Sequence, residues 1–94
     1  MKLGIALKYI RIFHGMSIRD VTEAINLSST GHISGLENGK KEVNLNMIKR
    51  YSEFFGIPSY DIIKIAESLE HPLPRIIEDN EKAEVIMSWI GLMP

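Results

Sequence analysis

Side chains able to bind another molecule gather in one short stretch, TGHISGLENGKK, at residues 30–41. A threonine, a histidine, a serine and an asparagine supply hydrogen-bond donors and acceptors there, and two adjacent lysines add positive charge. Ile33 and Leu36 have the spacing of one helix face. Gly31 and Gly35 lie beside that face, although glycine inside a helix costs about 1 kcal/mol relative to alanine. The stretch therefore predicts a helix with a polar, recognition-competent outer surface.

Residues for catalysis or metal binding are scarce elsewhere. The chain has no cysteine, which excludes disulfides, thiolate zinc sites and cysteine nucleophiles. His14, His32 and His71 are far apart and lack metal-ligand spacing. No Ser-His-Asp set and no pair of carboxylates can be assigned to a pocket. We expect no enzymatic activity, no metal and no cofactor.

Composition indicates one small globular chain. Its 94 residues are 45% hydrophobic and 24% charged, which is ordinary for a soluble protein. Lys8 and Arg11 interrupt the apolar start, so we predict no signal peptide. No apolar run approaches the roughly 18 residues of a membrane span. We expect a cytoplasmic protein with no membrane partner.

Charge is unevenly distributed between the two halves of the sequence. Residues 1–50 carry a net charge of +4 and residues 51–94 a net charge of -5. This asymmetry fits a surface for a polyanion, and chance scatter in a small protein explains it equally well.

Apolar residues at helical spacing indicate an all-α fold, with no strand-like alternation. The expected helices cover residues 3–13, 17–25, 29–38, 44–55 and 59–69. Ser17 with Asp20, Asn44 and Ser59 are the expected helix starts. Gly15, Asn26, Gly39 and Gly56 are the expected ends. The inward-facing residues of the fourth helix are Leu45, Ile48, Tyr51, Phe54 and Phe55, and we assign Phe54, Phe55 and Tyr60 to the core rather than to a base-stacking platform.

The helices over 17–25 and 29–38 are joined by a short turn, and the second has a polar outer face. This arrangement is a helix-turn-helix. In such a unit the first helix braces the phosphate backbone, and the second lies in the major groove with its first residues at base edges.

Residues 3–63 resemble the Cro/C1-type (XRE) helix-turn-helix family of phage repressors and related bacterial regulators. The matching pieces are LGIALKYIRIFHGMS, IRDVTEAINLS, ISGLENGKK and LNMIKRYSEFFGIPSYDII. The resemblance implies a five-helix lambda-repressor-like domain over residues 1–70. It also implies a sequence-specific DNA-binding transcriptional regulator, a repressor, that binds a two-fold-symmetric operator on double-stranded DNA.

The resemblance also implies roles for individual residues. The residues at or beside the positions that contact bases in the family are Ser29, Thr30, Gly31, His32, Ser34 and Gly35. The residues expected to contact DNA phosphates are Ser17, Arg19, Asn38, Lys40, Lys41, Asn44 and Asn46. Arg11 and Glu37 fall where family members form an ion pair that ties the first helix to the end of the third.

Three departures from the family pattern affect these roles. The segment from Leu27 to Ile33 is one residue longer than usual, which leaves the register there open by one. Ile18 stands where a phosphate-contacting glutamine is common. Two base-reading positions are glycine, so side-chain readout would fall to Thr30, His32 and Ser34.

The C-terminal extension, residues 71–94, resumes helical spacing between Arg75 and Ile90 with an apolar face. An exposed apolar face usually marks an interface. We therefore expect a homodimer with Ile86, Trp89 and Ile90 at its interface. The alternative is that the extension folds back as a sixth core helix. A rival function is an antitoxin or adaptor whose C-terminal region binds a protein partner.

Overall fold

Six helices and no strand make up the parts of the chain that the structure describes, residues 2–70 and 78–90 of a computed structural model. The helices are α1 (Leu3–Phe13), α2 (Ile18–Ala24), α3 (Thr30–Glu37), α4 (Leu45–Phe55), α5 (Ser59–Ser68) and α6 (Asp79–Ser88). The expected all-α fold of five helices and one further C-terminal helix is thereby confirmed. His71 and residues 75–77 of the expected last helix lie outside the described residues.

Two helix starts follow the local sequence. The Ser17 hydroxyl accepts a hydrogen bond from the Asp20 amide, and the Asp20 carboxylate accepts one from the Ser17 amide. The bond from the Ser17 amide is the main reason that the pKa of Asp20 lies below its usual range. Asn44 caps α4 in the same way, through its side-chain oxygen. The expectation for Ser59 is wrong, because α5 starts at Ser59 itself after Pro58 and has no side-chain cap.

Helix ends use left-handed backbone where the sequence predicts it. Gly15, Gly39 and Gly56 have φ of 67°, 82° and 70°, and Asn26 has φ of 59°. Glycine adopts this conformation without steric cost, and asparagine tolerates it better than most residues. These four residues let the chain reverse direction between successive helices.

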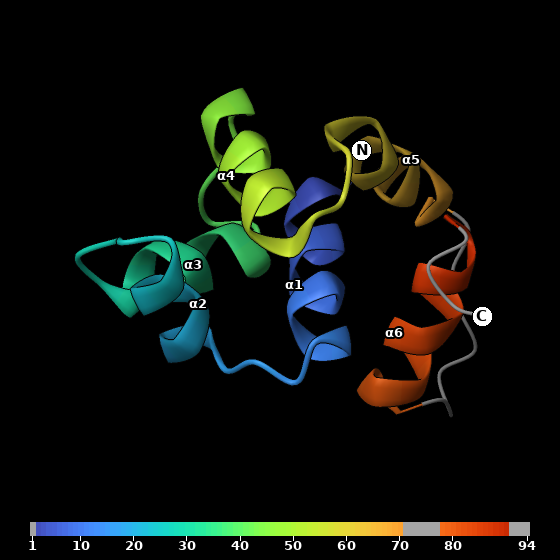
Figure 1. Cartoon of the computed structure of the whole chain (residues 1–94), viewed down its shortest axis with the longest axis horizontal. Helices are drawn as coiled ribbons and strands as arrows, with labels where there is room; N and C mark the ends of the chain where they lie inside the picture. The colour runs from blue at the N-terminus through green and yellow to red at the C-terminus, as the bar shows by residue number, and fades with distance from the viewer. Residues whose placement is uncertain (1, 71–77, 91–94) are drawn as a thin grey trace.

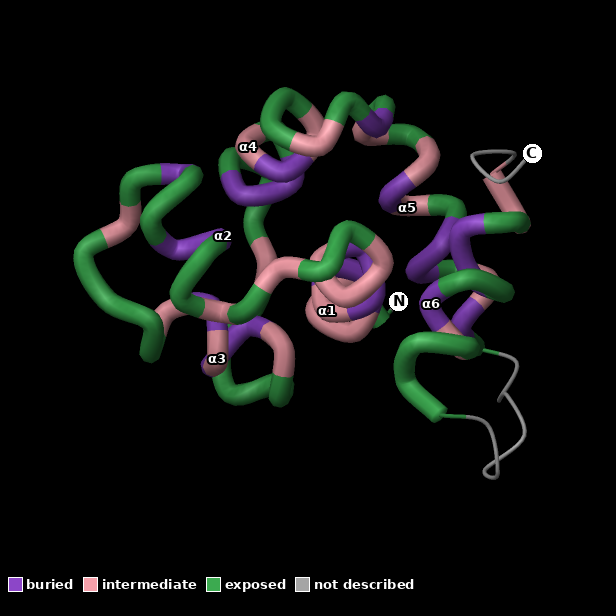
Figure 2. Tube along the Cα trace, turned by 60° about the horizontal axis from the view of Figure 1, so that its bottom comes forward, coloured by how far each residue is buried: buried purple, intermediate pink, exposed green. Residues whose placement is uncertain are grey.

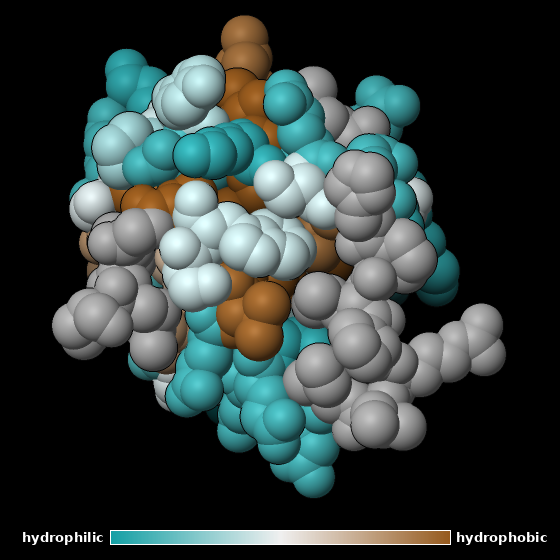
Figure 3. Space-filling model, turned by 90° about the vertical axis from the view of Figure 1, so that its right-hand side faces the viewer, coloured by the Kyte–Doolittle hydropathy of each residue, from teal (hydrophilic) through white to brown (hydrophobic). Residues whose placement is uncertain are grey.

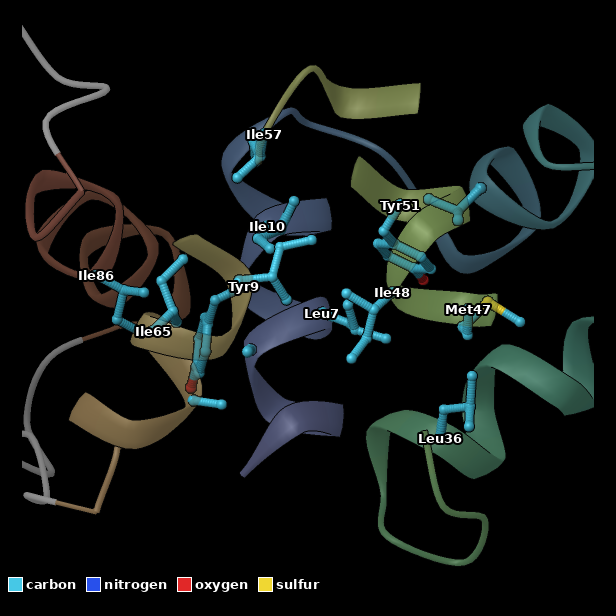
Figure 4. Close-up of a cluster of buried hydrophobic side chains, with 14 of the residues drawn as sticks. Leu7, Tyr9, Ile10, Leu36, Met47, Ile48, Tyr51, Ile57, Ile65 and Ile86 are labelled. Carbon is cyan, nitrogen blue, oxygen red and sulfur yellow. The ribbon is translucent and has the colours of Figure 1, made fainter. Parts of the chain in front are cut away.

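Helix α1 lies at the centre of the molecule, with α2, α3 and α4 on one side and α5 and α6 on the other (Figures 1 and 2). Figure 4 shows that Leu7 points toward Ile48 and Tyr51 of α4. On the opposite side Tyr9 lies with Ile65 of α5 and Ile86 of α6. One continuous core therefore runs through both sides of α1.

Helix α6 packs on α1 and contributes Ala83, Ile86 and Met87 to the core of its own chain. The Tyr9 hydroxyl donates a hydrogen bond of 3.2 Å to Asp79 at the start of α6. The expectation that Ile86 lies at a dimer interface needs correction, because its exposed fraction is 0% within one chain. Sequence periodicity shows that a helix has an apolar face but not which surface covers it.

Three residues expected in the core are exposed instead. Leu45 is 79% exposed, Phe54 45% and Tyr60 74%. All three lie in the first or last turn of a helix. Phe55, by contrast, is half-buried against the core.

Gly4 of α1 lies directly against the backbone of α3. A Cβ atom at this position would lie 1.9 Å from the Leu36 carbonyl oxygen and 3.0 Å from its carbon. We expect Gly4→Ala to lower the free energy of unfolding by about 1–3 kcal/mol, since the two helices must move apart. Urea denaturation measures the loss. Gly31→Ala is the control, because the nearest atom to its added methyl group is Ser29 Oγ at 3.3 Å, and equal stability of the two variants would contradict the prediction.

Candidate nucleic-acid interface

Helices α2 and α3 contact each other and are joined by a tight turn over residues 25–29. The Leu27 amide donates to the Thr22 carbonyl at 2.9 Å, which closes the end of α2. Asn26, just before Leu27, has left-handed backbone. Ser29 starts α3, and its hydroxyl accepts a hydrogen bond from the Gly31 amide at 3.1 Å. The local sequence thus builds the turn and uses the Ser29 hydroxyl as a cap.

Helix α3 presents its first turn to solvent and buries the opposite face. Ile33 is 0% exposed and Leu36 is 2% exposed, so they anchor the helix in the core. Thr30 and Gly31 are exposed, while His32 and Ser34 are half-buried. The base-readout candidates whose side chains keep some access to a ligand are therefore Ser29, Thr30, His32 and Ser34, although the Ser29 hydroxyl is already engaged as the helix cap.

Gly35 does not lie on this accessible surface. It is buried, although it was expected among the base-readout residues. The aliphatic part of the Lys41 side chain covers it, with Cγ and Cδ each 3.1 Å from where a Cβ would be. A lysine six residues away in sequence determines this burial, and no helical pattern predicts it.

All seven candidate phosphate ligands are exposed: Ser17, Arg19, Asn38, Lys40, Lys41, Asn44 and Asn46. Three of them also stabilise the backbone, since Ser17 and Asn44 cap helices and the Asn38 side chain accepts from the Lys40 amide at 3.1 Å. The candidates come from the start of α2, the loop after α3 and the start of α4. Amides at helix starts and lysines in loops are common phosphate ligands.

Arg11 and Glu37 form a bidentate ion pair between α1 and the last residue of α3. Arg11 Nε donates to Glu37 Oε2 and Arg11 Nη2 donates to Oε1, both at 2.8 Å. Arg11 Nη1 also donates to the Met16 carbonyl at 2.9 Å. The two side chains are 12% and 8% exposed. Hydrogen bonding to Glu37 is the main reason that the pKa of Arg11 is raised, and the pair fixes the end of α3 against α1.

Tyr51 lies beside this pair, where sequence reasoning placed only an apolar core residue. Burial, then the nearby Glu37 charge, raises the pKa of the Tyr51 phenol well above its usual value. Its buried hydroxyl has no hydrogen-bond partner among the described residues. The ring thus contributes mainly apolar packing next to the charged pair.

Two contacts near α3 have no signal in the sequence. The first joins Lys41 Nζ to His32 Nδ1, which lie 3.4 Å apart. In the second, Arg50 of α4 donates a hydrogen bond of 3.2 Å to the Ile25 carbonyl, and this bond connects α4 to the start of the turn. Both join residues that are separated along the chain. Only the packing of the helices brings them together.

The described residues contain no group of three or more potential metal ligands. Within the same residues, none of the helices combines the length and apolar character needed to cross a bilayer.

The turn-linked pair α2–α3, with its buried anchor residues and exposed first turn, defines a helix-turn-helix protein. A family model described as helix-turn-helix matches residues 7–62, more than half of the chain. The chain belongs to this family, the Cro/C1-type (XRE) helix-turn-helix proteins, and is a DNA-binding regulator of that type. Comparison with curated proteins and with solved structures found no match.

Proposed function

We propose that this chain is a sequence-specific transcriptional repressor that binds a two-fold-symmetric operator as a homodimer. The observation that carries the proposal is the exposed first turn of α3, followed by two exposed lysines at the other end of the helix. In a helix-turn-helix, those first residues reach base edges in the major groove, and flanking basic residues hold the phosphates. Half-sites would be about one helical turn of DNA apart.

A homodimer needs a surface on each copy that the monomer leaves uncovered. Phe54 and Tyr60 near the α4–α5 junction are exposed, as is Val85 of α6, while Trp89 and Ile90 are half-buried. Figure 3 views the side of the molecule formed by α5 and α6, and apolar surface lies there between hydrophilic side chains. We propose that dimerisation uses Trp89 and Ile90 with the neighbouring exposed part of this side.

Selection of bound duplexes from a random DNA pool tests the proposal. The expected result is one enriched motif with two inverted half-sites. Sedimentation of the complex would then give two chains for each duplex. Failure to enrich any motif would contradict sequence-specific binding, and one chain for each duplex would contradict the dimer.

The antitoxin or adaptor function has less support. Helix α6 packs Ala83, Ile86 and Met87 into its own chain, so most of its apolar face is not free for another protein. Purification of the chain from its native host tests this alternative. A stoichiometric second protein that stays bound through Val85 or Trp89 would favour the adaptor function.

Lys40→Ala should weaken binding about equally on every DNA sequence. Lys40 is exposed in the loop after α3, where a lysine meets phosphate rather than a base. Loss of one phosphate contact should lower the slope of log K against log salt by about 1. Titrations at several salt concentrations measure this slope. Lys64→Ala is the control, since this exposed lysine lies on α5, across α1 from α3 (Figure 1), and equal slopes for both variants would contradict the assignment.

A further inference from the structure

Lys41 extends back across α3 instead of into the solvent beyond the loop. Its amide donates to the Gly35 carbonyl at 3.0 Å, which holds the residue beside the helix. Its aliphatic stem then passes over Gly35, where an added Cβ would be 3.1 Å from two of its carbons. Its ammonium group arrives 3.4 Å from His32 Nδ1. The missing side chain at position 35 therefore lets Lys41 reach the outer surface of the recognition helix.

We propose that Lys41 and His32 form one base-reading pair with a preference for guanine, and that Gly35 positions it. This inference rests on the DNA-binding function proposed above. It moves Lys41 from the phosphate-binding residues to the base-reading residues, and it gives the glycine at position 35 a role that its own lack of a side chain would otherwise exclude.

The hydrogen-bonding chemistry of the pair favours guanine. An ammonium group only donates, so His32 Nδ1 is the acceptor in this contact. His32 Nε2 lies on the far edge of the ring from Lys41, so the role of His32 in the pair is to hold the ammonium group in place. One of the three Lys41 donors is used in that contact, and two remain on the same nitrogen atom. These two adjacent donors match N7 and O6 of guanine, the two acceptors on its major-groove edge, whereas adenine offers one acceptor beside a donor.

A purely structural role for the contact is weak by comparison. Lys41 is exposed and His32 is half-buried, and charged contacts in water contribute only about 0–1 kcal/mol to folding. Lys40 carries the same charge one residue earlier, but its amide bonds to Asn38, and among the described residues its side chain has no hydrogen bond to α3. Lys40 is therefore a matched control, with equal charge and a different expected role.

The experiment compares wild type, Lys41→Ala, His32→Ala, the double variant with both of these changes, Gly35→Ala and Lys40→Ala. Each protein is checked for helical content and thermal unfolding, and its preferred motif is then selected from the same random DNA pool. Binding is also titrated on the wild-type motif and on versions with each guanine replaced. The wild type should prefer guanine at one position of each half-site by roughly 5- to 100-fold.

Lys41→Ala and His32→Ala should each remove most of this preference, and the double variant should lose little more than either single one. Gly35→Ala should reduce the same preference by displacing the Lys41 stem, while its stability stays equal or rises because alanine favours helix. Lys40→Ala should keep the motif unchanged. These results together support a base-reading pair.

Two other results would overturn the inference in distinguishable ways. If Lys41→Ala weakens binding equally on all sequences and lowers the salt slope as Lys40→Ala does, Lys41 is a phosphate ligand and only this inference fails. If the wild type enriches no motif, the proposed sequence-specific function fails and the base-reading pair fails with it.

Discussion

Arg11→Ala is expected to lower the free energy of unfolding by about 3–5 kcal/mol, the typical cost of breaking a buried ion pair by removing one partner. Glu37 would keep its carboxylate in a position where the side chain is only 8% exposed, with no cation beside it. The Met16 carbonyl would also lose the hydrogen bond from Arg11 Nη1. Urea denaturation followed by circular dichroism measures the difference.

Tyr51→Phe is a matched control for Arg11→Ala in the same part of the core. It removes one polar atom that has no hydrogen-bond partner among the described residues, so stability should be unchanged or slightly higher. Arg11→Lys separates charge from geometry, because a lysine cannot make the bidentate contact and should restore only part of the stability. If Arg11→Ala lowers the free energy of unfolding by less than about 1 kcal/mol, the pair contributes no more than an ordinary surface ion pair, and the prediction is contradicted.

Ile86→Ala is expected to cost about 2–5 kcal/mol, the range for truncation of a large buried aliphatic side chain. Ile86 is fully buried between α6 and the rest of its own chain. The decrease in the free energy of unfolding relative to wild type should therefore be the same at low and high protein concentration. A residue at a dimer interface would instead change the concentration at which the chains associate.

Val85→Ala is the control for Ile86→Ala on the same helix. Val85 is 38% exposed, and substitutions of such residues usually change stability by about 0.5 kcal/mol or less. If Ile86→Ala keeps the stability of wild type but weakens association between chains, α6 is a dimerisation element and its observed packing on α1 does not hold in solution.

The sequence predicts this fold well because most of its signals are local. The Ser17–Asp20 capping box, the Asn44 cap and the left-handed glycines each depend on a few neighbouring residues. Ser59 shows the limit, since a serine near a helix start caps it only when the backbone places it one residue earlier. The presence of each helix and most helix boundaries can therefore be predicted from residues that are close together in the sequence.

The candidate site was predictable only in part. The exposed first turn of α3 and the lysines after it were expected from the pattern of apolar and polar residues. The burial of Gly35 under Lys41 was not, since that contact depends on the path of the loop after α3. The exposure of Phe54 and Tyr60 was missed for a related reason, because apolar periodicity does not show which part of a helix another element covers.

Local sequence is sufficient to specify the helices, the turn between α2 and α3, and the polar surface of α3. These features depend on backbone preferences, capping and periodicity, all of which act within about one or two helical turns. Three features depend on the packing of distant segments: α6 packs on α1, Arg11 and Glu37 bury their charges together, and Lys41 reaches His32. Those contacts form when distant segments exclude water from a shared surface, so their energies depend on the packed arrangement and not on any single stretch of the chain.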